Sequence, residues 1–192
     1  MNHNRLILTF LICCFAVFVP AKHAAAHQKP EVTISELTAT TSDTHLIVFG
    51  TLENSFTSEM IEVLHSGIPL RFSFFIDLYK TTDNWPDEQI VSYNFQHTMV
   101  FDTLKERYRV TLEEKNNKIL TFQSLFEAQK VINEINGAKI VELNQLIPDN
   151  LYKLTIRADL YQKTLPMNLH TILPFFSWWD IKTETYSLKF KY

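Results

Sequence analysis

Two consecutive segments of this chain place apolar residues at every second position, which is the pattern of half-buried β-strands. In the first segment the apolar face carries Leu70, Phe72, Phe74, Ile76 and Leu78. In the second it carries Val91, Tyr93, Phe95, Met99 and Phe101. Residues 81–89 between the segments are rich in Asp, Asn and Pro, which favour a turn. We therefore expect a long antiparallel strand pair at the centre of a sheet.

Similar alternation predicts further strands along the chain. Their ranges are 32–37, 45–52, 107–112, 118–122, 139–143, 152–161 and 185–192. The first two of these are expected to pair as a hairpin. Asn116 and Asn117 suit a second, tight hairpin, because asparagine tolerates a positive φ angle better than most residues.

A short helix is predicted at 58–66, between the first hairpin and the long strand pair. Gly67 would cap its end, and Pro69 would prevent its continuation. A weaker helical turn is expected within 167–173.

A second helix has a stronger signal. Ser124 and Glu127 fit a capping box, in which both side chains satisfy free backbone N–H groups. Its apolar stripe consists of Leu125, Ala128, Val131, Ile132 and Ile135. Gly137 would stop this helix.

This order of elements predicts a mainly β fold: an antiparallel β-sandwich or partly closed barrel with two inserted short α-helices. No internal repeat or linker interrupts residues 27–192, so we expect a single β-rich domain there. An immunoglobulin domain is disfavoured because its Cys…Trp…Cys frame is missing from the sequence.

Residues 1–26 follow the three-part pattern of a cleaved secretory signal peptide. Residues 1–5 carry one positive charge, residues 6–20 are apolar, and Ala24 to Ala26 offer the small residues that signal peptidase recognises. The apolar run of 15 residues is shorter than the about 20 that a spanning helix needs. An uncleaved anchor and a lipoprotein modified near Cys13 and Cys14 are the alternatives.

Cleavage after Ala26 would remove both cysteines, and with them any disulfide or thiolate chemistry. An exported chain without disulfides favours the bacterial envelope, and the periplasm in particular. Loss of Arg5 and Lys22 would change the net charge from −3 to −5. An acidic chain of this kind argues against nucleic-acid binding. No transmembrane helix is expected after signal cleavage.

Several stretches resemble the bacterial family called domain of unknown function 4390. They are NSFTSEMIE (54–62), SGIPL (66–70), FDTL (101–104) with Tyr108, LY (151–152), RA (157–158), LP (165–166), and WD (179–180) with Thr183 and Tyr186. Their order and spacing carry the resemblance over essentially the whole exported chain. Because this family has no assigned activity or catalytic residues, the resemblance implies only an exported envelope protein. Some members are encoded near sensor histidine kinases, which implies a link to signalling.

His97 lies on the apolar face of the 91–101 segment. A buried histidine can transfer protons near neutral pH. Asp102, however, lies five residues away and therefore on the opposite face of a strand. We interpret His97 as a structural, hydrogen-bonded residue rather than a catalytic one.

Motifs for other chemistry are missing from the sequence. The remaining histidines after the signal are His27, His45, His65 and His170, and none has a partner at metal-ligand spacing. The chain has no Gly-x-Ser-x-Gly and no glycine-rich phosphate loop. We therefore predict no catalytic residue, no cofactor and no metal site.

Two short polar patterns have simple structural interpretations. Asp102 and Thr103 suit a turn or a helix cap, because their side chains bond nearby backbone N–H groups. Arg157 and Asp159 share a strand face, which favours an ion pair over an anion site.

An aromatic patch before the last strand is the most suggestive surface feature of the sequence. It consists of Phe175, Phe176, Trp178 and Trp179. Such clusters cover the end of a core, anchor partners or lipid, or line a small-molecule pocket. These four residues are the candidate contact site for a partner or ligand.

Four functions compete. The leading one is a periplasmic, non-catalytic binding or accessory module that presents a sheet edge or the aromatic patch to an envelope protein or lipid. The main alternative is a carrier of a small apolar ligand or lipid in a cavity of the β-sandwich or barrel. An outer-membrane β-barrel and a hydrolase with a dispersed site have less support in the sequence.

Overall fold

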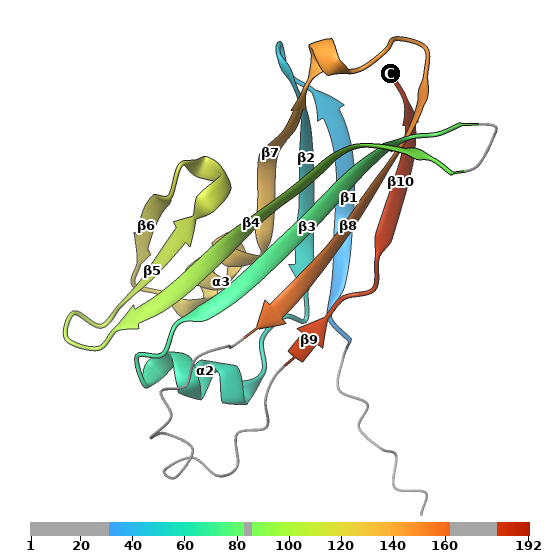
Figure 1. The fold of residues 1–192 in the computed structure, drawn as a ribbon. Helices are drawn as coiled ribbons and strands as arrows, with labels where there is room; N and C mark the ends of the chain where they lie inside the picture. The colour runs from blue at the N-terminus through green and yellow to red at the C-terminus, as the bar shows by residue number, and fades with distance from the viewer. Residues whose placement is uncertain (1–30, 83–85, 162–179) are drawn as a thin grey trace, which may run out of the picture.

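The computed structural model describes residues 31–82, 86–161 and 180–192. These residues form two antiparallel β-sheets, one of seven strands and one of three, with two α-helices (Figure 1). A sandwich-like arrangement of separate sheets therefore replaces the partly closed barrel that the sequence also allowed. The mainly β fold class is confirmed.

The larger sheet contains the long strand pair that the alternation predicts. Its order is β10 (Tyr186–Lys191), β8 (Leu151–Tyr161), β3 (Leu70–Lys80), β4 (Glu88–Asp102), β5 (Arg107–Leu112) and β6 (Lys118–Phe122), and β9 (Asp180–Lys182) also pairs with β8. Phe74 on β3 lies opposite Phe95 on β4 and Ala158 on β8. The predicted antiparallel pair thus occupies the centre of the sheet.

The smaller sheet has the order β1 (Thr33–Thr41), β2 (His45–Glu53) and β7 (Glu134–Glu142). The predicted first hairpin is confirmed, although β1 extends beyond its predicted end. A β-bulge interrupts β1 between Ser35 and Thr38, and Glu36 within it has a φ of 54°. This bulge changes the direction of the edge strand beside β2.

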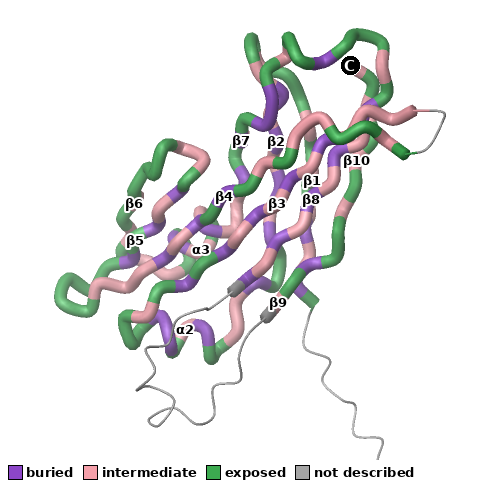
Figure 2. Tube along the Cα trace, in the orientation of Figure 1, coloured by how far each residue is buried: buried purple, intermediate pink, exposed green. Residues whose placement is uncertain are grey.

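The core lies between the two sheets and is formed by the inward faces of their strands (Figure 2). Its largest fully buried side chains are Tyr152, Phe72, Phe74, Phe95, Leu46, Leu52, Leu64, Leu70, Ile76, Leu78, Met99 and Ile132. All five apolar residues that alternate along β3 are buried, because one face of this central strand meets the core.

The first helix, α2 (Ser58–His65), is confirmed with its end signal. The hydroxyl of Thr57 caps the start of the helix by accepting a hydrogen bond from the backbone N–H of Met60. Gly67 adopts a φ of 83° just after the helix, a conformation that glycine tolerates best.

The second helix, α3 (Leu125–Asn133), packs against β5, β4, β6 and β2. Ala128 and Ile132 are its buried residues. The helix therefore covers the inner face of the larger sheet beside the three-stranded sheet.

Two details predicted for α3 are wrong. The hydroxyl of Ser124 makes no capping hydrogen bond, so the capping box does not form. The helix ends at Asn133, and the chain continues directly as β7, where Ile135 pairs with Gly50 of β2. Gly137 has a φ of 70° at a register shift in this pair instead of ending the helix. Pairing with β2 overrides the helical pattern.

The connections between the later strands contain two short 3-10 helices, η1 (Glu113–Lys115) and η2 (Leu143–Gln145). Asn116 and Asn117 both have a φ of 57°, as predicted, but η1 makes the β5–β6 connection longer than a tight hairpin. The strand predicted at 139–143 begins earlier, at Glu134. The helical turn predicted within 167–173 lies outside the described residues. Within the described ranges, no helix has the length and apolar character needed to cross a membrane.

Candidate functional site

The aromatic patch predicted from the sequence lies outside the described residues. Its four members are Phe175, Phe176, Trp178 and Trp179. Two of the histidines considered in the sequence, His27 and His170, also lie outside the described residues. Asp180 begins β9, which pairs with the end of β8. The candidate surfaces of the described residues lie elsewhere in the fold.

His97 lies on the inner face of β4 with 0% of its side chain exposed, which confirms its predicted orientation. Its Nδ1 lies 2.8 Å from the carbonyl oxygen of Ile132, near the end of α3. Its Nε2 lies 3.0 Å from Oε2 of Glu114 on η1, whose side chain is 1% exposed. The rings of Phe74 and Phe95 pack against the imidazole.

These two hydrogen bonds fix the orientation of the imidazole ring. A carbonyl oxygen only accepts, so Nδ1 of His97 donates to Ile132, and Nε2 faces the carboxyl group of Glu114. Both ring nitrogens of this buried histidine therefore have a partner. The pair connects β4, η1 and α3, and the structural interpretation of His97 is supported.

Two tyrosines near this region have raised pKa values. Burial raises the pKa of Tyr93, and the carboxylates of Glu114 and Glu113 raise it further. Burial also raises the pKa of Tyr108, whose hydroxyl lies 2.7 Å from Nε2 of His65. Both phenols therefore stay protonated at neutral pH, so neither is an activated nucleophile.

The other two polar patterns also take the structures predicted for them. Oδ1 of Asp102 accepts hydrogen bonds from the backbone N–H groups of Leu104 and Lys105 in the β4–β5 turn. Arg157 and Asp159 form an ion pair of 2.8 Å, and the guanidinium lies 4.0 Å from the ring centroid of Phe75. Both patterns stabilise the fold locally.

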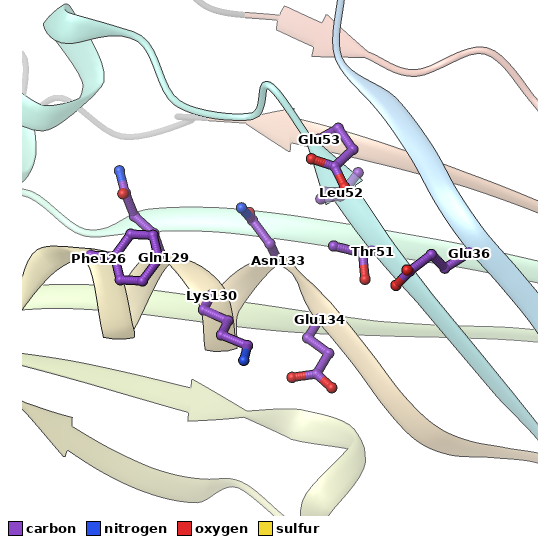
Figure 3. A pocket seen from close by; sticks show the side chains of 9 residues that line it. All are labelled: Glu36, Thr51, Leu52, Glu53, Phe126, Gln129, Lys130, Asn133 and Glu134. Carbon is purple, nitrogen blue, oxygen red and sulfur yellow. The ribbon is translucent and has the colours of Figure 1, made fainter.

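A groove of about 390 Å³ lies between α3 and the strands β1 and β2 (Figure 3). Its lining consists of Glu36, Thr51, Leu52, Glu53, Phe126, Gln129, Lys130, Asn133 and Glu134. Side chains from α3 form one wall and residues of β2 the other, with Glu36 of β1 beyond them. We call this feature the α3 groove.

Local structure explains how these residues meet. The helix α3 runs directly into β7, so Asn133 ends the helix and Glu134 begins the strand, opposite Thr51 of β2. The hydroxyl of Ser55, which is 2% exposed, donates to Oδ1 of Asn133 at 2.6 Å. This bond joins the segment after β2 to the end of α3. The bulge in β1 places Glu36 at the same groove.

The α3 groove combines acidic side chains with an exposed aromatic ring. Glu36, Glu53 and Glu134 line it, against a single base, Lys130. Phe126 is 75% exposed, although a phenylalanine normally gains by burial. The groove can therefore offer both carboxylate acceptors and an apolar contact.

The sequence contains a signal for Phe126 that the alternation and helical-stripe patterns do not capture. The residue lies off the apolar stripe of α3, where a surface helix normally carries polar residues. The acidic partners of the groove had no comparable signal, because they come from three separate strands, of which β7 is far from β1 and β2 in the sequence.

A second groove, of about 380 Å³, lies at the opposite end of β2 and β7. It is lined by Asp43, Thr44, His45, Glu142, Leu143 and Asn144. Nδ1 of His45 lies 2.7 Å from the hydroxyl of Thr44. Across the ranges that the structure describes, no three His, Cys, Asp or Glu side chains are grouped to hold a metal ion.

Comparisons with known proteins support the resemblance found in the sequence. The model of the family described as Domain of unknown function (DUF4390) matches residues 29–189. No curated protein and no solved structure matches the chain. Since the family match extends over most of the sequence, this chain belongs to the DUF4390 family, whose function is unknown.

Proposed function

We propose that this chain is an exported periplasmic protein that binds an envelope partner without catalysing a reaction, as an accessory module with a link to signalling. The α3 groove is its binding surface. The signal-like residues 1–26 support export, because their three-part pattern is the one that secretion requires.

The exposed ring of Phe126 beside the α3 groove carries this proposal. A phenylalanine that is 75% exposed loses the stabilisation that burial would give it in the free protein. Here the ring lies beside a concave surface with polar side chains, which is the arrangement of a docking site. Contact with a partner would bury the ring.

The chemistry of the described residues favours binding over catalysis. The buried pair of His97 and Glu114 satisfies its hydrogen bonds internally. Both side chains are almost fully shielded from solvent, so a substrate has no direct access to them. A catalytic acid or base must reach its substrate within hydrogen-bond distance.

The ligand-carrier alternative receives less support. A carrier needs unfilled space between its sheets. In the described part of the chain, large side chains such as Phe72, Phe74 and Phe95 occupy the inner faces of the larger sheet. Their rings pack on one another or on neighbouring aromatic rings. This dense interior favours a surface-binding role.

In-cell photo-crosslinking tests the proposed function. A photoreactive amino acid replaces Gln129 in the α3 groove of the full chain, expressed in the organism that encodes it. The control position is Leu104 in the β4–β5 turn, which is 94% exposed. We expect an adduct with an envelope protein from position 129 and none from position 104, in the periplasmic fraction. Absence of adducts at both positions, or a cytoplasmic location, would contradict the proposal.

A further inference from the structure

We propose that the α3 groove binds an extended basic polypeptide segment with an apolar side chain between its Lys or Arg residues. This inference rests on the proposed binding function and specifies the chemistry of the partner. It follows from the charge of the groove, the orientation of its carboxylates and the exposure of Phe126.

Charge gives the first argument. Glu36, Glu53 and Glu134 are contributed by β1, β2 and β7, and Lys130 is the only base in the lining. Among the described residues, none of the three carboxylates forms an ion pair. An excess of unpaired carboxylates attracts a cationic partner and repels nucleic acids and anionic lipid headgroups.

The orientation of two carboxylates gives the second argument. Oε1 of Glu53 accepts a hydrogen bond of 2.9 Å from the hydroxyl of Ser35. Oε1 of Glu134 accepts one of 3.0 Å from the side-chain amide of Asn136. These neighbours hold the carboxylates and leave each Oε2 without a partner in the described residues. Preorganised acceptors of this kind suit Lys or Arg, which form strong charge-assisted hydrogen bonds.

Phe126 gives the third argument, because a purely polar ligand would leave its ring in water. An apolar side chain on the segment would cover this ring, and an arginine could stack on its face. Leu52 lies in the same lining and adds apolar surface. A segment with alternating basic and apolar residues would satisfy both the carboxylates and the ring.

The size and the amide groups of the groove favour an extended peptide segment as the ligand over the surface of a folded domain. A volume of about 390 Å³ accommodates a few side chains. Gln129 and Asn133 add amide groups to the same wall. The amide nitrogen of Asn133 stays available to a peptide carbonyl, because its hydrogen bond to Ser55 uses Oδ1.

Peptide binding to the full exported chain tests this inference. The probes are fluorescein-labelled peptides of sequence KFKAKFK, EFEAEFE and KAKAKAK, measured by fluorescence anisotropy. We expect KFKAKFK to bind at least about tenfold more tightly than either other peptide, because it alone supplies both charge and apolar contact. Its affinity should fall as salt is added, since screening weakens charge attraction.

Variants locate the binding surface. Phe126→Ala should weaken KFKAKFK binding about tenfold, and Glu53→Gln and Glu134→Gln about threefold each. The matched controls are Leu104→Ala, an exposed apolar residue elsewhere, and Glu127→Gln, an exposed acid of α3 outside the groove lining. Equal binding of the acidic peptide, or equal effects of the control variants, would overturn the inference.

The peptide result and the crosslinking result separate the two proposals. An adduct from position 129 without selective KFKAKFK binding would leave the binding function standing and contradict the basic segment. Selective peptide binding without any adduct in cells would support the groove chemistry and contradict the envelope-partner function.

Discussion

His97 and Glu114 form a shielded pair in the core, with 3.0 Å between Nε2 and Oε2 and less than 2% of either side chain exposed. The imidazole also donates from Nδ1 to the carbonyl oxygen of Ile132. A strand, a 3-10 helix and the end of α3 are therefore joined through one histidine. We expect this pair to stabilise the fold strongly.

Substitutions at these two positions should separate hydrogen bonding from charge. His97→Ala leaves a buried carboxylate without its partner and should lower the free energy of unfolding by about 3–5 kcal/mol. Glu114→Gln keeps a side-chain amide that can hydrogen-bond to Nε2 and should cost less than about 1.5 kcal/mol. Urea denaturation followed by circular dichroism measures both values. A Glu114→Gln variant as unstable as His97→Ala would indicate that the charge itself is required.

The hydrogen bond from Ser55 to Asn133 should contribute to the stability of the α3 groove. Ser55→Ala leaves the amide oxygen of Asn133 without its partly buried donor, so we expect a loss of about 1–2 kcal/mol in unfolding free energy. Ser66→Ala removes an exposed hydroxyl at the end of α2 and is the control, with a smaller loss expected. Equal losses in the two variants would contradict the role assigned to Ser55.

Two glycines in neighbouring strands should respond oppositely to alanine. Gly137 has a φ of 70°, where a Cβ atom adds strain, so Gly137→Ala should cost about 1–2 kcal/mol. A Cβ atom on Gly50 would have its nearest contacts at 3.7 Å, so Gly50→Ala should be neutral or stabilise by about 0.5 kcal/mol. Thermal unfolding of both variants tests this difference, and equal shifts in Tm would contradict it.

The ion pair between Asp87 and Lys153 should make stability depend on acid pH. The hydrogen bond from Lys153 holds the pKa of Asp87 below its ordinary value of 3.8, against the opposing effect of burial. The folded carboxyl thus binds its proton less readily than the unfolded one. The stabilisation that the ion pair gives the folded state is complete above pH 3.8, and it is lost as the pH falls through the lowered folded pKa of Asp87.

Asp87→Asn should therefore lower the Tm at neutral pH, and the difference from the unsubstituted protein should shrink as the pH falls below 3.8. Asp43→Asn, in the exposed β1–β2 turn, is the control with a smaller effect at neutral pH. Tm measurements across this range provide the test. A difference that stays constant down to low pH would show that Asp87 acts through packing instead of charge.

The boundary between α3 and β7 shows where local pattern becomes ambiguous. Ile135 fits both a helical stripe and an alternating strand. Because it continues the apolar stripe of α3, the sequence predicted helix there. Its pairing with Gly50 across the sheet decides for strand. Sheet pairing depends on residues distant in the sequence, and local helical preference differs by less than about 1 kcal/mol between most residues.

The sequence by itself determined the central strands, α2 and the inward orientation of His97, because alternation and capping act over a few neighbouring residues. The tertiary structure decided that Glu114 meets His97, and that Glu36, Glu53 and Glu134 share a groove with Phe126. Strand register and the bulge in β1 bring these residues close together. Such contacts arise from the packing of the whole chain, so no local run of residues encodes them.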